Sequence, residues 1–433
     1  MTIALAPSAT STPNASVSWA RSYLIVGLVA LAAGLAVIFY AFRAQGLVNS
    51  EYDPYAFGAM GSSIAHGDGL APFGSLIQRR APLYPLMIGA LYRAFGEQPL
   101  AVQLAQCLLL AGTTILVFDI GRRVFNQRTG VVAALVCAFN PMLLRYVADL
   151  QLETLLTFLF TLTIWCTVRF CERPTVFGGV AIGVAAGLAS LTKSVAFPYP
   201  FLFAAGLLLV ALLGRRRSRP SVPWAGLAAM FFALFLVISP WTIRNYFATG
   251  GHFVLLSSGA SDAFLRGYIF TKPEYATLRL PPYTYAENES NQLFESLSSA
   301  AGTVWQRDDY ETDQILNRAA VQQLVADPGA FVRKFGVGLF TFWYEMTSLT
   351  NSIIAGGLAL VSWVLAIIGL RRSLREERPA WLLILPAIYL NVFLAALLAL
   401  GRYSVPILPG LLIVSAFGID TLLNSASRRL ARG

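Results

Sequence analysis

Charge, histidine and cysteine are scarce in this chain. Of its 433 residues only 12% are charged, while 56% are hydrophobic, and it contains two histidines and four cysteines. The histidines, His66 and His252, are far apart in sequence, and no cysteine pair has the spacing of zinc ligands. The sequence also lacks a phosphate-binding P-loop and a dinucleotide-binding glycine fingerprint. We therefore expect no cofactor and no nucleotide substrate, and the sequence leaves a requirement for a divalent cation open.

Long runs without charge dominate the chain instead. Residues 22–42 carry no charge, and at 1.5 Å per residue about 20 helical residues cross a hydrocarbon core of roughly 30 Å. No A-x-A-like cleavage site follows this run, so we expect an uncleaved first helix behind a disordered tail, residues 1–20. The sequence thus predicts an all-α polytopic membrane protein. About ten crossings are expected, at residues 22–42, 100–118, 130–147, 154–170, 176–191, 195–213, 223–241, 353–370, 380–399 and 403–424.

Clusters of arginine predict the orientation of these crossings. If the N-terminus is cytoplasmic, alternate loops are rich in arginine, as the positive-inside rule requires. We assign the net charge of +10 to anchoring at the cytoplasmic membrane surface near anionic lipid, and we do not expect nucleic acid as a partner. The clusters are Arg122, Arg123 and Arg128; Arg215, Arg216, Arg217 and Arg219; Arg371, Arg372, Arg375 and Arg378; and Arg428, Arg429 and Arg432.

Two stretches between apolar runs are long enough to form outer regions. In the first, residues 83–95 are too short to cross and predict an interfacial helix. In the second, residues 308–328 have apolar side chains at helical spacing, and residues 330–346 are amphipathic and expected along the membrane surface. The expected organisation is an N-terminal transmembrane module at 21–242 that includes a first outer loop at 43–99, an extracytoplasmic loop domain at 243–351, and C-terminal transmembrane helices with a short basic tail at 352–433.

A series of short motifs resembles a known enzyme family. The order and predicted placement of these motifs are similar to those of glycosyltransferase family 39, the group of the protein O-mannosyltransferases and lipid A aminoarabinose transferases. The resemblance implies a GT-C fold and the use of a polyprenyl-phosphate sugar as donor. The motifs are Asp53, Gly67-Asp68-Gly69, Arg80-Ala81-Pro82-Leu83-Tyr84-Pro85, Gly121-Arg122-Arg123, Asn140-Pro141, Leu152-Glu153-Thr154, Gly187 to Lys193, Pro240 to Tyr246, and Arg402-Tyr403 with Pro406 and Pro409.

Carboxylates in the outer loops are the candidate catalytic groups. Transfer from a polyprenyl-phosphate sugar needs a base for the acceptor, and the resemblance implies that Asp53 has this role. The family commonly has an Asp-Glu pair here, whereas Pro54 follows Asp53 and the nearest acidic partner is Glu51. Glu153 is the third catalytic candidate. Local capping of a turn or a helix N-terminus is the alternative role for these acids.

Basic residues at the same level are candidates for binding the carrier phosphate, because cations stabilise the phosphate as it leaves. They are Lys193, Arg80, Arg402 and Arg244. Snorkelling to the interface is the alternative role for Lys193, and ordinary anchoring at the interface is that for Arg402. For the acceptor or the sugar we single out Asp149, Tyr84 and His66. The alternatives are an interfacial aromatic residue for Tyr84 and a solvated loop histidine for His66. Asp149 and Glu153 are four residues apart, a spacing that predicts one shared helical face.

The sequence therefore predicts an integral membrane glycosyltransferase with its active site on the extracytoplasmic side. It would transfer a sugar with inversion, by a metal-independent mechanism, to an acceptor protein, lipid A or a glycan. A polytopic transporter or lipid flippase is the main alternative, but transporters place ionisable residues near the bilayer midplane, whereas these charges fall at outer ends of the runs. A scaffold that binds polyprenyl lipid without catalysis is the third possibility.

Overall fold

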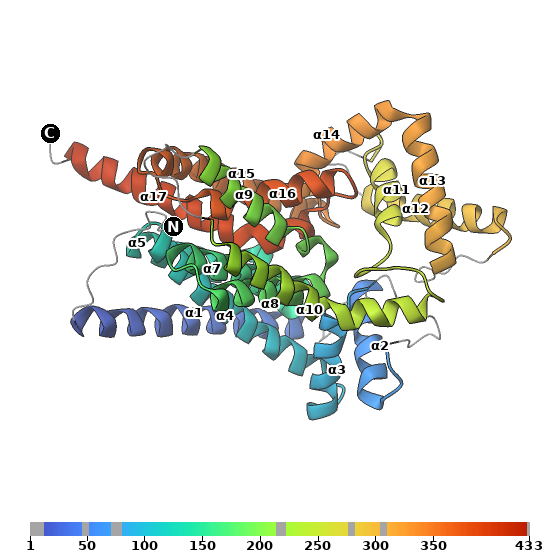
Figure 1. The fold of residues 1–433 in the computed structure, drawn as a ribbon, viewed down its shortest axis with the longest axis horizontal. Coiled ribbons are helices and arrows are strands. Elements are labelled where there is room, and N and C mark those ends of the chain that lie inside the picture. The colour runs from blue at the N-terminus through green and yellow to red at the C-terminus, as the bar shows by residue number, and fades with distance from the viewer. Residues whose placement is uncertain are drawn as a thin grey trace.

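A computed structural model of the chain describes residues 13–45, 52–70, 80–213, 222–275, 282–303 and 310–430. Every regular element in these ranges is a helix (Figure 1). The elements are α1 (Pro13–Gln45), α2 (Tyr52–His66), α3 (Leu83–Phe95), α4 (Pro99–Val124), α5 (Gln127–Ala138), α6 (Pro141–Ala148), α7 (Glu153–Glu172), α8 (Val176–Thr192), η1 (Ser194–Ala196), α9 (Tyr199–Leu213), α10 (Trp224–Ala248), α11 (Ala260–Phe270), α12 (Pro282–Ala300), α13 (Tyr310–Ala326), α14 (Pro328–Tyr344), α15 (Leu349–Arg375), α16 (Trp381–Ala395), η3 (Gly401–Ile407) and α17 (Leu408–Leu430).

Each of the ten predicted apolar runs falls on helical structure. Among the described residues, seven helical segments are long and apolar enough to cross a membrane: Trp19–Arg43, Pro99–Val124, Glu153–Glu172, Ser194–Leu212, Trp224–Ala248, Leu349–Arg375 and Gly401–Ser427. The remaining three runs fall on the bent pair α5 and α6 and on two shorter apolar helices, α8 and α16. The all-helical polytopic fold is confirmed, while the count of ten crossings stays a prediction.

The third predicted crossing, residues 130–147, is not one continuous helix. It is broken between α5 and α6, whose axes differ by 47°. Asn140 lies at the break in extended conformation, and its side-chain oxygen accepts hydrogen bonds from the backbone N–H groups of Met142 and Leu143 at 3.0 and 3.4 Å. Pro141 follows in the first turn of α6, where the missing N–H of proline costs nothing. An N-cap followed by proline therefore starts a new helix inside the apolar run.

The first half of α8 packs closely against α10. A Cβ atom on Gly179 would come within 2.0 Å of the Gly226 carbonyl oxygen, and one on Gly183 within 2.2 Å of that of Met230. Only glycine permits this approach, which is typical of small-residue packing between membrane helices.

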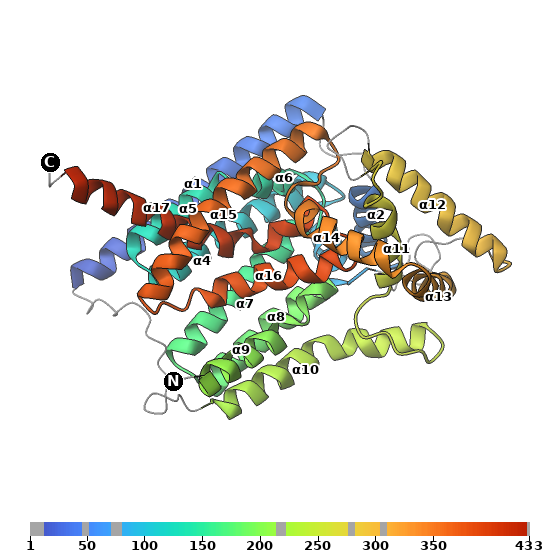
Figure 2. The ribbon, with the colours of Figure 1, turned by 90° about the horizontal axis from the view of Figure 1, so that it is seen from above.

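The helices that were predicted as outer regions gather at one end of the bundle. Figure 1 shows α2 and α3 below and α11, α12 and α13 above at this end, and Figure 2 shows α12 and α13 projecting beyond the long helices. The predicted helix at residues 308–328 is confirmed as α13. Asp327 ends it and caps α14 by accepting a hydrogen bond from the Ala330 N–H at 2.8 Å. The amphipathic segment at residues 330–346 is α14, and its position at a membrane surface stays a prediction.

The structure differs from the sequence prediction in two further respects, a helix in the first outer loop and the start of the first long helix. The first outer loop contains a regular helix, α2, which packs on α3 through Gly61 and Gly89, where side chains would collide with Ile88 and Ile64. The predicted tail is too long, because α1 already begins at Pro13, a residue suited to the first turn of a helix. Residues 1–12 lie outside the described part of the chain.

Arginine-bearing helix ends meet at the opposite end of the bundle. Asp119 of α4 accepts hydrogen bonds from Arg122 and Arg123, both at 2.5 Å, and from the Trp165 indole of α7 at 2.8 Å. Arg372 at the end of α15 pairs with Asp420 of α17 at 2.8 Å. These pairs hold the arginines of α4 and α15 against neighbouring helices at this end. Arg215 to Arg219 lie outside the described residues.

Candidate active site

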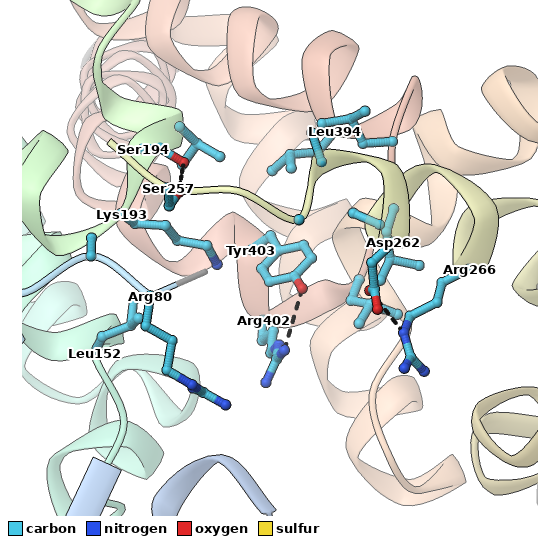
Figure 3. A pocket seen from close by; sticks show the side chains of 18 of the residues that line it. Arg80, Leu152, Lys193, Ser194, Ser257, Asp262, Arg266, Leu394, Arg402 and Tyr403 are labelled. Atoms are coloured by element: carbon cyan, nitrogen blue, oxygen red, sulfur yellow. Dashed lines mark hydrogen bonds and ion pairs between the residues drawn. The ribbon is translucent and has the colours of Figure 1, made fainter. Parts of the chain in front are cut away.

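A cavity of about 790 Å³ lies where α2, α11 and α12 meet the long helices. Its walls come from segments far apart in sequence: α2, the residues just before α3, the links between α6 and α7 and between α8 and α9, α11, α12, and the segment joining α16 to η3 (Figure 3). The residues that matter below are Phe57, Arg80, Gln151, Glu153, Lys193, Asp262, Arg266, Glu287, Arg402 and Tyr403.

Three of the four predicted phosphate-binding cations line this cavity. Lys193 follows the last residue of α8 in extended conformation, and its Nζ lies 3.8 Å from the centroid of the Tyr403 ring. Arg402, in η3, donates a hydrogen bond from Nη2 to the Tyr403 hydroxyl at 3.3 Å. The Arg80 guanidinium lies over the ring of Phe57, 4.7 Å from its centroid. Arg80, Lys193 and Arg402 thus line one cavity, whereas Arg244 does not, and the binding of phosphate stays a prediction.

Glu153 is the candidate carboxylate that the structure places in the cavity wall. It is the first residue of α7 and is 4% exposed. No hydrogen bond or ion pair joins its carboxylate to another described residue. A buried carboxylate that faces a cavity without such a partner is available to a ligand. Nearby in sequence, Gln151 also lines the cavity, and its side-chain oxygen is buried without a hydrogen-bond partner within the described ranges.

Asp149 and Glu153 do not share a helical face, contrary to the prediction. Helix α6 ends at Ala148, and α7 begins only at Glu153. The side-chain amide of Gln106 ends α6 by donating hydrogen bonds to the carbonyl oxygens of Tyr146, Val147 and Asp149 at 3.2, 2.9 and 2.8 Å. The Asp149 carboxylate lies 3.9 Å from Arg145 and does not line the cavity.

Three further site candidates lie elsewhere. Tyr84 is fully buried and donates a hydrogen bond to the Gln106 side-chain oxygen at 2.9 Å, so it supports the α6–α7 link from behind. Arg244 lies over the ring of Trp241, because α10 continues as a helix past the predicted end of the crossing at residue 241. His66 is exposed at the end of α2, 3.2 Å from Glu97. The predicted contact of these side chains with substrate is not supported by their positions.

Asp53 lies in the first turn of α2, but its side chain is outside the described part of the structure, and so is the whole of Glu51. Phe57, one helical turn beyond Asp53, lines the cavity.

A second charged cluster in the cavity was not predicted. Arg266 of α11 pairs with Asp262 at 2.9 Å and with Glu287 of α12 at 2.7 Å. Its Nη2 also donates to the Asn291 side chain at 2.9 Å. The i,i+4 spacing of Asp262 and Arg266 inside an otherwise apolar helix is the sequence signal that could have revealed this cluster.

Across the part of the chain that the structure describes, no three histidine, cysteine, aspartate or glutamate side chains come close enough to hold a metal ion.

Comparison with known proteins places this arrangement in a fold class. The crystal structure of the Archaeoglobus fulgidus oligosaccharyltransferase in the apo form aligns with a TM-score of 0.56 and 14% sequence identity over 95% of this chain and 52% of that chain. The same enzyme, AglB, in complex with an inhibitory peptide and a dolichol-phosphate aligns with a TM-score of 0.55 and 13% identity, over 95% and 51% of the two chains. The protein thus has the GT-C fold that the resemblance implied, and it spans about half the length of these archaeal chains.

Sequence comparison agrees over part of the chain. Residues 79–241, less than half of the protein, match the family described as dolichyl-phosphate-mannose-protein mannosyltransferase. This region includes Arg80, Glu153 and Lys193 but not Asp53 or Arg402. Comparison with curated protein sequences gives no significant match.

A further structural alignment is with ArnT from Cupriavidus metallidurans bound to undecaprenyl phosphate. It has a TM-score of 0.39 and 17% identity, over 96% of this chain and 79% of that chain.

Proposed function

We propose that this protein is an integral membrane glycosyltransferase. It transfers a sugar from a polyprenyl-phosphate donor to an acceptor on the non-cytoplasmic face of a bacterial inner membrane. The observation that carries the proposal is the convergence of Arg80, Lys193 and Arg402, from three distant segments, on one cavity that also contains the buried carboxylate of Glu153. The fold and the family match over residues 79–241 support the same class of reaction.

The cavity offers complementary surfaces to such a donor. Its cations suit a phosphate, since charge-assisted hydrogen bonds to phosphate are among the strongest in proteins. Apolar residues adjoin them and suit the first isoprene units of the lipid: Phe197, Pro198, Phe393, Leu394 and Leu397. A lipid with one charged group and an apolar tail therefore fits the cavity better than a soluble nucleotide sugar does.

The reaction follows from these groups. A carboxylate removes the proton from the acceptor hydroxyl as its oxygen attacks the anomeric carbon and inverts it. The bond between that carbon and the phosphate oxygen breaks, and polyprenyl phosphate leaves with the bonding electrons. Arg80, Lys193 and Arg402 stabilise the negative charge that develops, so the leaving group needs no proton. Asp53 is the proposed base, as the resemblance implies, and Glu153 is the second carboxylate at the site. The acceptor is a hydroxyl of a protein, of lipid A or of a glycan.

The proposal is tested by transfer of radiolabelled sugar from polyprenyl-phosphate donors to an envelope preparation by the purified protein. We expect transfer by the wild type and a loss of about 10²- to 10⁴-fold in Asp53→Asn, as is usual when a general base is removed. Glu97→Gln is the matched control, because Glu97 is an exposed acid of the same outer region that lies away from the cavity.

The outcomes separate the three classes of function. A flippase would move the donor across the bilayer without transfer, and a scaffold would bind it without consuming it. If Asp53→Asn is well folded, binds donor and transfers sugar at the wild-type rate, then Asp53 is not the base, and Glu153→Gln becomes the next variant to test.

A further inference from the structure

We infer that Asp262, Arg266 and Glu287 bind the sugar of the donor; we call these three residues the α11–α12 wall. The inference rests on the proposed function and adds to it the location of the sugar subsite and the chemistry of its ligand, the ring hydroxyls of a neutral sugar.

The position of the wall relative to the cations supports this assignment. Figure 3 shows Lys193 on one side of Tyr403 and Asp262 with Arg266 on the other, all around the same cavity. The sugar of a polyprenyl-phosphate donor is bonded directly to the phosphate. If the phosphate lies at Lys193 and Arg402, the sugar must fill the neighbouring volume of the cavity, and the α11–α12 wall borders that volume.

The chemistry of the wall suits hydroxyl groups. Arg266 is 2% exposed and Asp262 is 1% exposed, and the guanidinium also lies 4.9 Å from the centroid of the Phe294 ring. Charged groups held this way in a low-dielectric wall are oriented before the ligand arrives. Two carboxylates and one guanidinium leave an excess of negative charge, which favours the hydroxyl donors of a sugar and repels a second phosphate.

A separate polar group in the same cavity also requires a ligand. The Gln151 side chain is 3% exposed and lines the cavity, and its oxygen has no hydrogen-bond partner within the described residues. A buried acceptor without a partner costs free energy that a ligand hydroxyl would recover. A hydroxyl of the sugar is one group that could supply this hydrogen bond.

The distance between the cations and the wall is set by backbone packing. A Cβ atom on Gly267 would lie 1.9 Å from the Leu397 carbonyl oxygen, so α11 rests directly on the segment that joins α16 to η3. Arg402 belongs to η3, and Arg266 precedes Gly267 on α11. The two ends of the cavity are therefore held at a fixed separation, as recognition of one rigid phosphosugar requires.

The test compares two lipids, polyprenyl phosphate without a sugar and polyprenyl phosphate carrying mannose or glucose, bound to the full-length protein in nanodiscs. Glu287→Gln is the main variant, because Glu287 is the most exposed member of the wall and glutamine can still accept a hydrogen bond from Arg266. We expect it to weaken binding of a sugar-bearing lipid about 10-fold or more and to change binding of the bare lipid less than about twofold. Lys193→Met should weaken binding of both lipids.

The matched control is Glu289→Gln. Glu289 is on the same helix, loses an ion pair with Lys272 when changed, and lies outside the cavity lining. It should bind both lipids as the wild type does. If Glu287→Gln lowers the affinity for both lipids equally, or for neither, the wall only joins α11 to α12 and the inference is wrong. If the wild type binds neither lipid, the proposed function itself fails.

Discussion

Removing the cations of the cavity one at a time should measure their contribution to donor binding. Lys193→Met and Arg402→Met keep much of the side-chain length and remove the charge. A charge-assisted contact is worth roughly 1.5–3 kcal/mol, so each change should weaken binding of polyprenyl phosphate about 10- to 100-fold. Both cations lie around one ring, with Lys193 3.8 Å from the Tyr403 centroid and Arg402 3.3 Å from its hydroxyl. They can therefore reach one phosphate, and the double variant should lose more than either single one.

The assay is equilibrium binding of polyprenyl phosphate to protein in nanodiscs at fixed ionic strength, because salt screens such contacts. Arg244→Met is the control. The sequence predicts Arg244 at the same membrane level as the other cations, but in the structure it lies over Trp241 outside the cavity lining. The Arg244→Met variant should bind polyprenyl phosphate as tightly as the wild type does. Unchanged affinity in both single variants and in the double variant would refute the assignment of the phosphate site.

Two further predictions concern orientation and stability. A cysteine introduced at Ser299, exposed on α12, should react in intact cells with a thiol reagent that cannot cross the membrane, whereas a cysteine at Ser427 on α17 should not react. The four native cysteines are buried and should not contribute to the labelling. The opposite labelling pattern would reverse the proposed topology. Burial lowers the pKa of Lys334 from 10.5 to about 7 in the folded protein. Below pH 7 the buried ammonium is charged and destabilises the folded state. Between about pH 7 and 10.5 the folded protein has lost this proton and the unfolded protein keeps it, so the destabilisation decreases as the pH rises. Thermal unfolding should therefore show wild-type stability rising over that range relative to Lys334→Met, and parallel curves would contradict the argument.

The sequence was most informative where membrane topology constrains a residue. Arg80, Lys193 and Arg402 lie beside apolar helices, so the order of the helices alone places them at one end of the bundle. Residue spacing was less reliable. The four-residue interval between Asp149 and Glu153 predicts a shared face only if the helix is continuous, and Gln106, distant in sequence, ends that helix.

Side-chain packing decided the rest of the site. Tyr84, inside the Arg80–Pro85 motif, was a candidate for contact with the acceptor or the sugar, but its hydroxyl donates a hydrogen bond to Gln106 in the interior. The pairing of Arg266 with Glu287 depends on how α11 packs against α12, and no local pattern in the sequence encodes that contact. Charged residues between membrane-length runs are ordinarily solvated. Only the burial of Asp262 and Arg266 in the structure distinguishes them from such solvated residues.

The most direct test of the account is a structure of the protein determined with bound polyprenyl phosphate. We predict that the phosphate lies within hydrogen-bond distance of Lys193 and Arg402, with Arg80 on the same side of the cavity and the isoprene chain along Phe393 and Leu394. A phosphate bound at the opposite end of the bundle, or outside the cavity, would contradict the central claim that this cavity is the donor site.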